Sequence, residues 1–258
     1  MEGASFWKKL SDKMSKSKDP VKDIEQAMKD LRAYERYKVW DLEAVKLIYG
    51  GSTYNVRDMS FSGLGADWIN ASELEQVPFN TITDAKMHVL GQEFPVHVIC
   101  VRKMGSIGGL RFQHDLPESL VKLGTFIEHL RGGATFQEID KSNVKEKYQH
   151  PDWIALRGDG PVDLLISKGT GGSTRDAVLS FPRGEQYQEL TWNHGVIKTG
   201  VTMDNSGPGS RVAQTQEVDE TTLRQGIEIL LGVKQADWRV LIEPLLIQAL
   251  SLLKKKAT

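Results

Sequence analysis

Two short groups of polar residues have the types and spacing to hold a phosphate-bearing purine. The segment "RAYER" places Arg32 and Arg36 four positions apart, and "DMSFSG" follows with Asp58, Ser60 and Gly63. A guanidinium grips a phosphate through two hydrogen bonds or lies flat on a purine ring. An aspartate accepts hydrogen bonds from the ring donors of guanine or holds an arginine in place. A serine hydroxyl adds a short hydrogen bond, and a glycine lets a ring approach the backbone.

These groups are complementary to one kind of small molecule. Guanine presents O6 and N7 as a paired acceptor edge that matches a guanidinium fork. A guanine-containing, phosphate-bearing ligand therefore satisfies all of them together. Arg36 and Asp58 are separated by about the length of a hairpin of two strands. If the arginine segment unwinds into a short arm, we expect the arm and the Asp-Ser-Gly turn to meet at one rim of a barrel.

Six strand-like runs must position the two groups. They are "EAVKLIYG", "STYNVRDM", "GADWIN", "AKMHVL", "FPVHVICVRKM" and "GGLRFQ", and glycine, asparagine or proline breaks most of the gaps. Six short strands favour a small antiparallel β-barrel, because closing the sheet removes its edges. A helix is predicted next, with Pro117 in its first turn and Gly132–Gly133 at its exit. The barrel domain with its following helix is thus expected over residues 31–133, and the fold class is mainly β.

Residues 1–30 are expected to form a tail and a helix. Val21, Ile24, Met28 and Leu31 recur at helical spacing after Pro20. Within residues 5–16, four apolar side chains could line one face of a short basic helix that docks on a partner or lies peripherally on a membrane: Phe6, Trp7, Leu10 and Met14. The alternative is a frayed, solvated terminus.

Residues 134–258 form a second predicted unit, a C-terminal α+β domain whose role the sequence does not assign. Five strand-like runs precede two helices, one from near Asp219 to near Gly232 and one over roughly 237–254. The glycine-rich "SKGTGGSTRD" lacks the spacing of a phosphate loop and is interpreted as a hairpin loop. We recognise no nucleophile, acid–base or metal cluster in this half, and the six histidines are scattered, so neither catalysis nor a metal is expected.

The first unit resembles the PilZ domain family, bacterial receptors for cyclic di-GMP. The resemblance rests on "RAYER" followed by "DMSFSG", with "GGLRF" (108–112) similar to a late strand of that domain, and it covers about residues 31–133. It implies a six-stranded barrel with a following helix. It also implies that Arg32 and Arg36 clamp guanine and phosphate groups, that Asp58 and Ser60 bind a guanine edge, and that Gly63 leaves room for the base.

The function that the resemblance implies is a non-catalytic cyclic di-GMP receptor acting on motility, secretion or exopolysaccharide control. Leu31 stands where family members that take up a stacked ligand pair carry a basic residue, so one ligand per domain is implied. A protein partner is expected but not identified, and a homodimer is possible. The alternative is a structural adaptor that acts through protein contacts of the C-terminal domain, independently of nucleotide. In that case the arginines are solvated or pair with Glu35 or Asp30, and Asp58 and Ser60 satisfy a turn.

Composition places the chain among ordinary globular proteins. At 258 residues and 28.9 kDa, with a formal net charge of -1, the chain gives no general reason to expect nucleic-acid binding. The single cysteine, Cys100, lies in the apolar run "VHVICV" and is predicted to be a buried free thiol, which suits a reducing compartment. We recognise neither a secretory signal nor a membrane span, and a cytoplasmic location is therefore expected.

Overall fold

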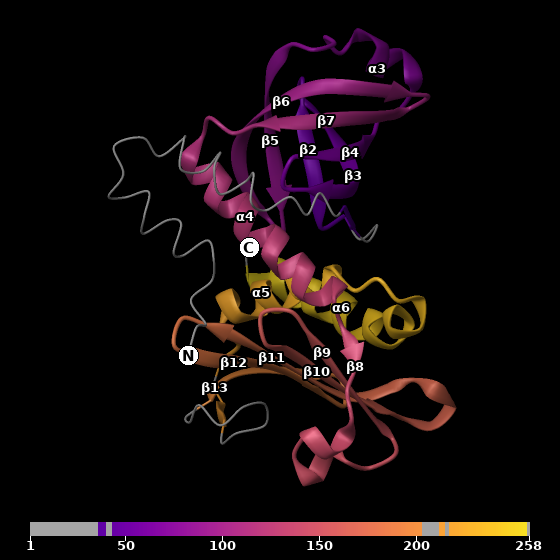
Figure 1. Ribbon diagram of the computed structural model, residues 1–258, viewed down its shortest axis with the longest axis vertical. Helices are drawn as coiled ribbons and strands as arrows, with labels where there is room; N and C mark the ends of the chain where they lie inside the picture. Colours follow the sequence, from indigo (N-terminus) through magenta and orange to yellow (C-terminus); the bar gives the residue numbers. More distant parts are fainter. Residues whose placement is uncertain (1–35, 40–42, 203–211, 215–216, 257–258) are drawn as a thin grey trace. The chain divides into compact units, whose positions relative to one another are not determined.

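The computed structural model describes residues 36–39, 43–202, 212–214 and 217–256 (Figure 1). The described residues fall into two compact units, 36–128 and 129–256, and the division lies within a helix. The predicted N-terminal tail and helix, residues 1–30, lie outside the described residues, and so does Arg32.

The first unit contains a closed six-stranded antiparallel barrel, as predicted. The ring runs β3-β2-β5-β6-β7-β4 and closes because β4 pairs with both β7 and β3, while β1 adds to β3 as an extra strand (Figure 1). The strands are β1 (Tyr37–Lys38), β2 (Val45–Tyr49), β3 (Ser52–Ser60), β4 (Gly63–Asp67), β5 (Ile82–Val89), β6 (Gln92–Met104) and β7 (Ile107–Gln113).

Alternating side chains fill the barrel. Leu47, Met59, Leu64, Met87 and Leu110 come from five different strands and are fully buried. The β2–β3 connection is a two-residue turn of two glycines at 50 and 51, with φ of 58° and 83°. Positive φ at both central residues matches the twist of the flanking strands, and glycine adopts it without strain.

The predicted strand "GADWIN" is shorter than expected. Strand β4 ends at Asp67, and Trp68 then stacks on Tyr54 with ring centroids 4.6 Å apart. Asn70 accepts a hydrogen bond from the backbone nitrogen of Glu73 at 2.9 Å and caps helix α3 (Ala71–Gln76). The end of the predicted strand is therefore a helix cap, since asparagine satisfies the free donors of a first helical turn.

Helix α4 (Pro117–Ala134) confirms the helix predicted after the barrel. Gly132 and Gly133 lie in its last turn rather than beyond it. A Cβ atom at Gly133 would overlap the carbonyl oxygen of Ile229. Glycine is therefore needed there for close packing within the second unit.

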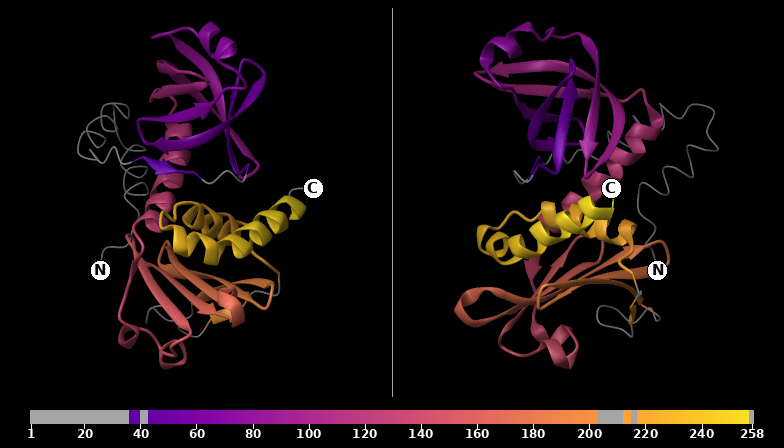
Figure 2. Two further views of the ribbon diagram at one scale, coloured as in Figure 1. Left: turned by 90° about the vertical axis from the view of Figure 1, so that its right-hand side faces the viewer. Right: turned by 180° about the vertical axis from the view of Figure 1, so that it is seen from behind.

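The second unit is an antiparallel sheet covered on one face by two helices. Each strand pairs with its neighbour in sequence, in the order β14-β13-β12-β11-β10-β9-β8. Helices α5 (Glu220–Leu231) and α6 (Ala236–Lys256) lie on the same face of the sheet (Figure 2). The strands are β8 (Gln137–Glu138), β9 (Trp153–Gly158), β10 (Val162–Lys168), β11 (Thr174–Arg183), β12 (Gln186–Asn193), β13 (Val196–Thr202) and β14 (Val212–Gln214).

The predicted helices and the hairpin loop of this unit are confirmed. Helix α5 begins after its N-cap Asp219 and ends at its C-cap Gly232. The glycine-rich segment joins β10 to β11 through the short 3-10 helix η3 (Thr170–Gly172). Two further 3-10 helices, η1 (Lys141–Asn143) and η2 (Glu146–Tyr148), connect β8 to β9. Within the described part of the chain, no helix is both long and apolar enough to span a membrane.

Candidate ligand-binding site

The structure joins Arg36 to Asp58, as their spacing predicts. Arg36 immediately precedes β1, where Lys38 lies opposite Asp58 of β3. Arg36 therefore lies outside a helix, as the short arm requires. Arg36 Nη1 donates to Asp58 Oδ1 at 2.6 Å, and the two side chains are 49% and 31% exposed. Both charges thus face solvent on the outside of the barrel.

Ser60, two residues beyond Asp58 in β3, stabilises the β3–β4 turn. Its side chain is buried, and its hydroxyl donates to the carbonyl oxygen of Gly63 at 3.3 Å. The same oxygen lies 3.1 Å from the Ser62 hydroxyl. Ser60 therefore closes the turn from within, as the alternative interpretation of the motif supposed.

Gly63 is required by the barrel itself. Its φ is not positive, so the turn does not demand glycine for its backbone angle. A Cβ atom at this position would overlap the carbonyl oxygen of Leu110 in β7. The close approach of β4 and β7 accounts for glycine at 63 without a ligand.

Gly65 gives room to the carboxylate of Asp58. The two residues are opposite in the β3–β4 register, and a Cβ atom at 65 would lie 3.2 Å from both carboxylate oxygens. The absence of a side chain lets Asp58 lie close to β4 while it holds Arg36. Gly65 lies two residues beyond Gly63 in the same run of the sequence but is not a position of the recognised motif.

Two more exposed arginines lie on the same outer surface of the barrel. In β7, Gly109 lies opposite Gly65 of β4 on one side and opposite Arg102 of β6 on the other. Arg111, two residues further along β7, lies opposite Gly63 of β4. Directly paired residues project to the same face of a sheet. Arg111 has no hydrogen-bond or ion-pair partner among the described residues, and Arg102 Nη2 contacts Met104 Sδ at 3.2 Å.

We call Arg36, Arg102 and Arg111 the outer arginines. Two carboxylates lie on this surface: Asp58 pairs with Arg36, and Asp67, two residues beyond Gly65 in β4, pairs with Arg57 at 3.6 Å. Arg102 and Arg111 have no carboxylate partner among the described residues, so this surface favours a ligand with more than one negative charge. Sequence reasoning did not assign Arg102 or Arg111 to the site. The alternation of "GGLRF" could have placed Arg111 outward, whereas a register shift between Cys100 and Arg102 disguises the position of Arg102.

The turn between β3 and β4 packs on a histidine. Phe61 stacks on His114 with centroids 5.0 Å apart and an interplanar angle of 11°. The backbone nitrogen of Phe112 donates to Ser62 O at 3.0 Å. Burial lowers the pKa of His114 to about 4, although the nearby charge of Asp115 acts in the opposite direction. His114 is therefore neutral at physiological pH and supports the turn as a flat, uncharged ring.

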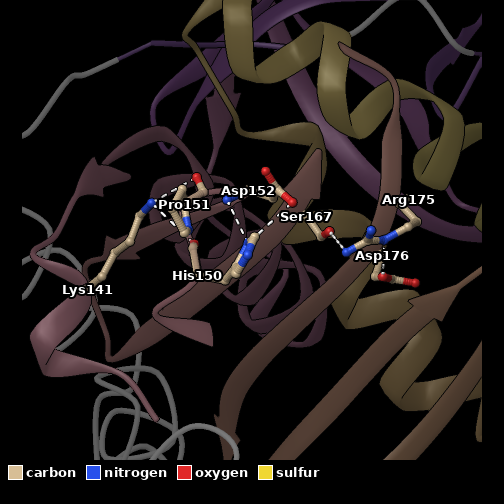
Figure 3. A network of polar contacts seen from close by, with 7 residues as sticks. All are labelled: Lys141, His150, Pro151, Asp152, Ser167, Arg175 and Asp176. Carbon is tan, nitrogen blue, oxygen red and sulfur yellow. Dashed lines mark hydrogen bonds and ion pairs between the residues drawn. The ribbon is translucent and has the colours of Figure 1, made fainter. Parts of the chain in front are cut away.

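A second polar cluster, in the C-terminal unit, contains serine, histidine and aspartate side chains (Figure 3). The hydroxyl of Ser167 accepts from Arg175 Nη2 at 2.8 Å. His150 Nδ1 instead accepts from the backbone nitrogen of Asp152 at 3.3 Å. Across the described residues, no hydrogen bond joins Ser167 to His150, so the cluster lacks the nucleophile–base contact of a hydrolase triad.

The other charges in this cluster make local contacts. Arg175 Nε lies 2.9 Å from Asp176 Oδ2, and Lys141 Nζ donates to Pro151 O at 3.1 Å (Figure 3). Among the residues the structure describes, no three histidine, cysteine, aspartate or glutamate side chains form a group that could hold a metal ion.

Comparison with known proteins assigns the chain to no family. No protein-family model matches it, and no curated protein matches it. Among solved structures, the crystal structure of an uncharacterized Legionella protein, Lpg0364, aligns over 38% of this chain and 95% of its own length. The two are 13% identical, with a TM-score of 0.30. This similarity is too low to support any conclusion about function.

Proposed function

We propose that the barrel unit is a PilZ-type receptor that binds cyclic di-GMP in the cytoplasm without converting it. The observation that carries this proposal is the contact between Arg36 and Asp58. It unites the two polar groups of the sequence at one place on the outside of a closed six-stranded barrel.

The Arg36–Asp58 pair is suited to exchange its partners for ligand groups. An exposed ion pair contributes only about 0–1 kcal/mol, so a ligand separates the two charges at little cost. The freed carboxylate then accepts from the N1 and N2 donors of guanine, and the freed guanidinium binds a phosphate in two-pronged fashion. Both groups start within one contact distance, so the ligand needs no large rearrangement to meet them.

Arg111 and Arg102 extend this surface on the other side of Asp58. Neighbouring strands are spaced by about 5 Å, so the sheet from β1 to β7 spans roughly 14 Å. A dinucleotide with two phosphates has the size and charge to contact Arg36 at one end of this span and Arg111 at the other. Mononucleotides would reach only one end.

Ligand binding would be coupled to the position of β1. This strand has only two residues, and its pairing with β3 is the attachment of the arginine segment to the barrel. A ligand that replaces Arg36 on Asp58 changes that attachment, and through it the upstream chain. Such coupling requires that the ligand bind with different affinity to two arrangements of the arginine segment, one with Arg36 paired to Asp58 and one with this pair separated.

Calorimetry of the whole chain with cyclic di-GMP tests the proposal. Binding at micromolar affinity or tighter is expected, with a loss of about tenfold or more in Arg36→Ala, Asp58→Ala and Arg111→Ala. Arg32 lies outside the described residues, and Arg32→Ala tests whether it helps to bind the ligand, as the PilZ resemblance implies. Arg131→Ala is the matched control, because it removes an exposed guanidinium that pairs with Asp159 at 2.9 Å in the other unit.

Cyclic di-AMP and GMP sharpen the same experiment. If Asp58 reads guanine, cyclic di-AMP binds more weakly than cyclic di-GMP, and the difference shrinks in Asp58→Ala. If two phosphates are needed, GMP binds more weakly than either. Absence of binding heat and of a thermal shift with wild-type protein and cyclic di-GMP would overturn the proposal.

A nucleotide-independent adaptor is the second candidate, and one observation favours it. Val240 and Ile247 lie on one face of α6, are 69% and 52% exposed, and present apolar surface for a protein partner. In that case Val240→Asp with Ile247→Asp abolishes the partner's binding, whereas Arg36→Ala leaves it intact. An effect of cyclic di-GMP on partner binding would count against this candidate.

A further inference from the structure

A pocket of about 300 Å³ lies within the second unit, against the first turn of α5, and both polar and apolar groups line it. Three of its lining side chains are buried polar groups: Gln188, Thr199 and Thr222 are 6%, 2% and 1% exposed. The remaining lining residues are Arg183 and Gln186 from the β11–β12 hairpin, Gly200 and Val201 from β13, and the N-cap Asp219. Ligand pockets typically combine an apolar lining with a small number of placed polar groups, and this pocket has that composition.

The amide of Gln188 has an unused hydrogen-bonding group in this pocket. The hydroxyl of Thr222 lies 2.7 Å from Asp219 Oδ1 and 3.1 Å from Gln188 Oε1. A hydroxyl has one proton to donate, so it serves one of these two oxygens. Neither this contact nor any other among the described residues occupies the amide nitrogen of Gln188. A side chain that is almost fully buried thus leaves a donor toward the cavity, and such a group gains stability from a ligand partner.

Asp219 and Arg183, which carry opposite charges, also have polar atoms at this pocket that are unpaired among the described residues. Asp219 Oδ1 accepts from the backbone nitrogen and the hydroxyl of Thr222, and Arg183 Nη1 lies 3.3 Å from it. The other carboxylate oxygen, Oδ2, has no partner among the described residues. Arg183 makes no further hydrogen bond within the described chain, so its Nε and Nη2 donors are available.

The charges of the pocket favour a ligand that carries both signs. Burial alone would raise the pKa of Asp219, but hydrogen bonds from Thr222 and the charge of Arg183 outweigh it and hold the pKa below its ordinary value. The carboxylate is therefore ionised at neutral pH. A simple anion would satisfy Arg183 and be repelled by Asp219, and a simple cation would do the reverse. A zwitterion satisfies both.

We propose that this pocket binds a small zwitterion of the α-amino-acid class. The ligand carboxylate binds the free donors of Arg183, its ammonium group binds Asp219 Oδ2, and a polar atom of its side chain accepts from Gln188. The pocket volume is at the lower end of the range for ligand sites, which suits a molecule of this size. The proposal is independent of cyclic di-GMP binding, because every residue that carries it belongs to the second unit.

The test uses the whole chain without nucleotide. Each proteinogenic amino acid is screened at millimolar concentration by saturation-transfer NMR, and the ones that bind are measured by calorimetry. At least one is expected to bind saturably, with affinity reduced about tenfold or more in Arg183→Gln and in Asp219→Asn. Asp219→Asn removes the charge but keeps an oxygen that caps α5, so the helix is expected to remain folded. Arg131→Gln, at an exposed guanidinium elsewhere in the unit, is the matched control.

Two analogues of the ligand that binds distinguish a zwitterion site from a simple ion site. The matching carboxylic acid without the amine and the matching amine without the carboxylate should each bind about tenfold more weakly or worse. Equal affinity for the carboxylic acid would identify an anion site at Arg183 and overturn the proposal. Absence of saturable binding by every amino acid, or unchanged affinity in both charge variants, would also overturn it.

Discussion

Two arginine–aspartate pairs of nearly equal length serve different purposes in the two units. Arg36 Nη1 is 2.6 Å from Asp58 in the barrel, and Arg157 Nε is 2.7 Å from Asp163 in the second sheet. The Asp58 side chain is 31% exposed, whereas that of Asp163 is 4% exposed and also accepts from Arg157 Nη2 at 3.3 Å. The buried carboxylate depends on its arginine, since water cannot replace it. The exposed pair can be separated at little cost, and this makes it available to a ligand.

The same division runs through the Asp-Ser-Gly motif of the barrel. Asp58 is partly exposed and its ion pair can be exchanged, whereas Ser60 and Gly63 are buried, Ser60 bonded within the turn and Gly63 packed against β7. Phe61 of the turn and His114 belong to this structural half, because their rings stack on each other. We therefore expect changes in the structural half to reduce stability and changes in the charged half to reduce binding.

Protonation of His114 is expected to give the largest loss of stability. Its pKa is about 4 in the folded protein and 6.5 ordinarily, so the folded state favours the neutral ring. This contribution is fully present above pH 6.5 and is lost as the pH falls toward 4, by up to about 3 kcal/mol. Urea unfolding across this range measures it. Because carboxylates titrate in the same range, the comparison is with His114→Phe, whose stability should fall less steeply. Parallel curves for the two proteins would contradict the prediction.

Gly63→Ala should destabilise the barrel by about 2–3 kcal/mol, because the new methyl group would overlap a backbone carbonyl that cannot move aside without opening β4 from β7. Gly65→Ala should cost less stability, since the Cβ atom there meets the side chain of Asp58, which can rotate away. Thermal or urea unfolding gives both values, and cyclic di-GMP calorimetry shows whether Gly65→Ala selectively weakens binding. The reverse order of stabilities would show that Gly63 is not a structural position.

Removal of the arginine from each of the two ion pairs is expected to give the smallest losses of stability. Arg157→Ala leaves the carboxylate of Asp163 buried without its partner and is expected to cost about 2 kcal/mol. Arg36→Ala is expected to cost less than about 1 kcal/mol, because water solvates Asp58. Equilibrium unfolding of both variants beside the wild type checks this contrast. A larger loss in Arg36→Ala would mean that the exposed pair anchors the barrel and is not free for exchange.

The sequence predicts the long elements of this fold and misses the short ones. Asp219 and Gly232 mark the ends of α5 correctly, because capping is a local property of the chain. Strands β1, β8 and β14 have two or three residues and form only because a neighbouring strand offers its edge. No periodicity can develop over so few residues. Gly133 suggests a helix end in the sequence, but its close approach to Ile229 is visible only in three dimensions.

The two candidate sites also differ in how far the sequence predicts them. The contact between Arg36 and Asp58 is predictable because a recognised spacing relates the two residues within one small barrel. The pocket beside α5 is not, since it combines a hairpin, a separate strand and a helix cap that share no local motif. The outward position of Arg102 is not predictable for a related reason. The register shift in β6 interrupts the alternation of inward and outward side chains from which that position would be inferred.

The single cysteine of the sequence provides an intrinsic reporter. Cys100 is 1% exposed, as predicted, and pairs with Leu110 next to the register shift between β6 and β7. Burial raises the pKa of its thiol, so both shielding and protonation keep it from reacting in the closed barrel. The rate of alkylation by a small maleimide therefore measures how often these strands separate, beside the surface that carries Arg102 and Arg111. Without any introduced label, a ligand that clamps this surface would slow that reaction.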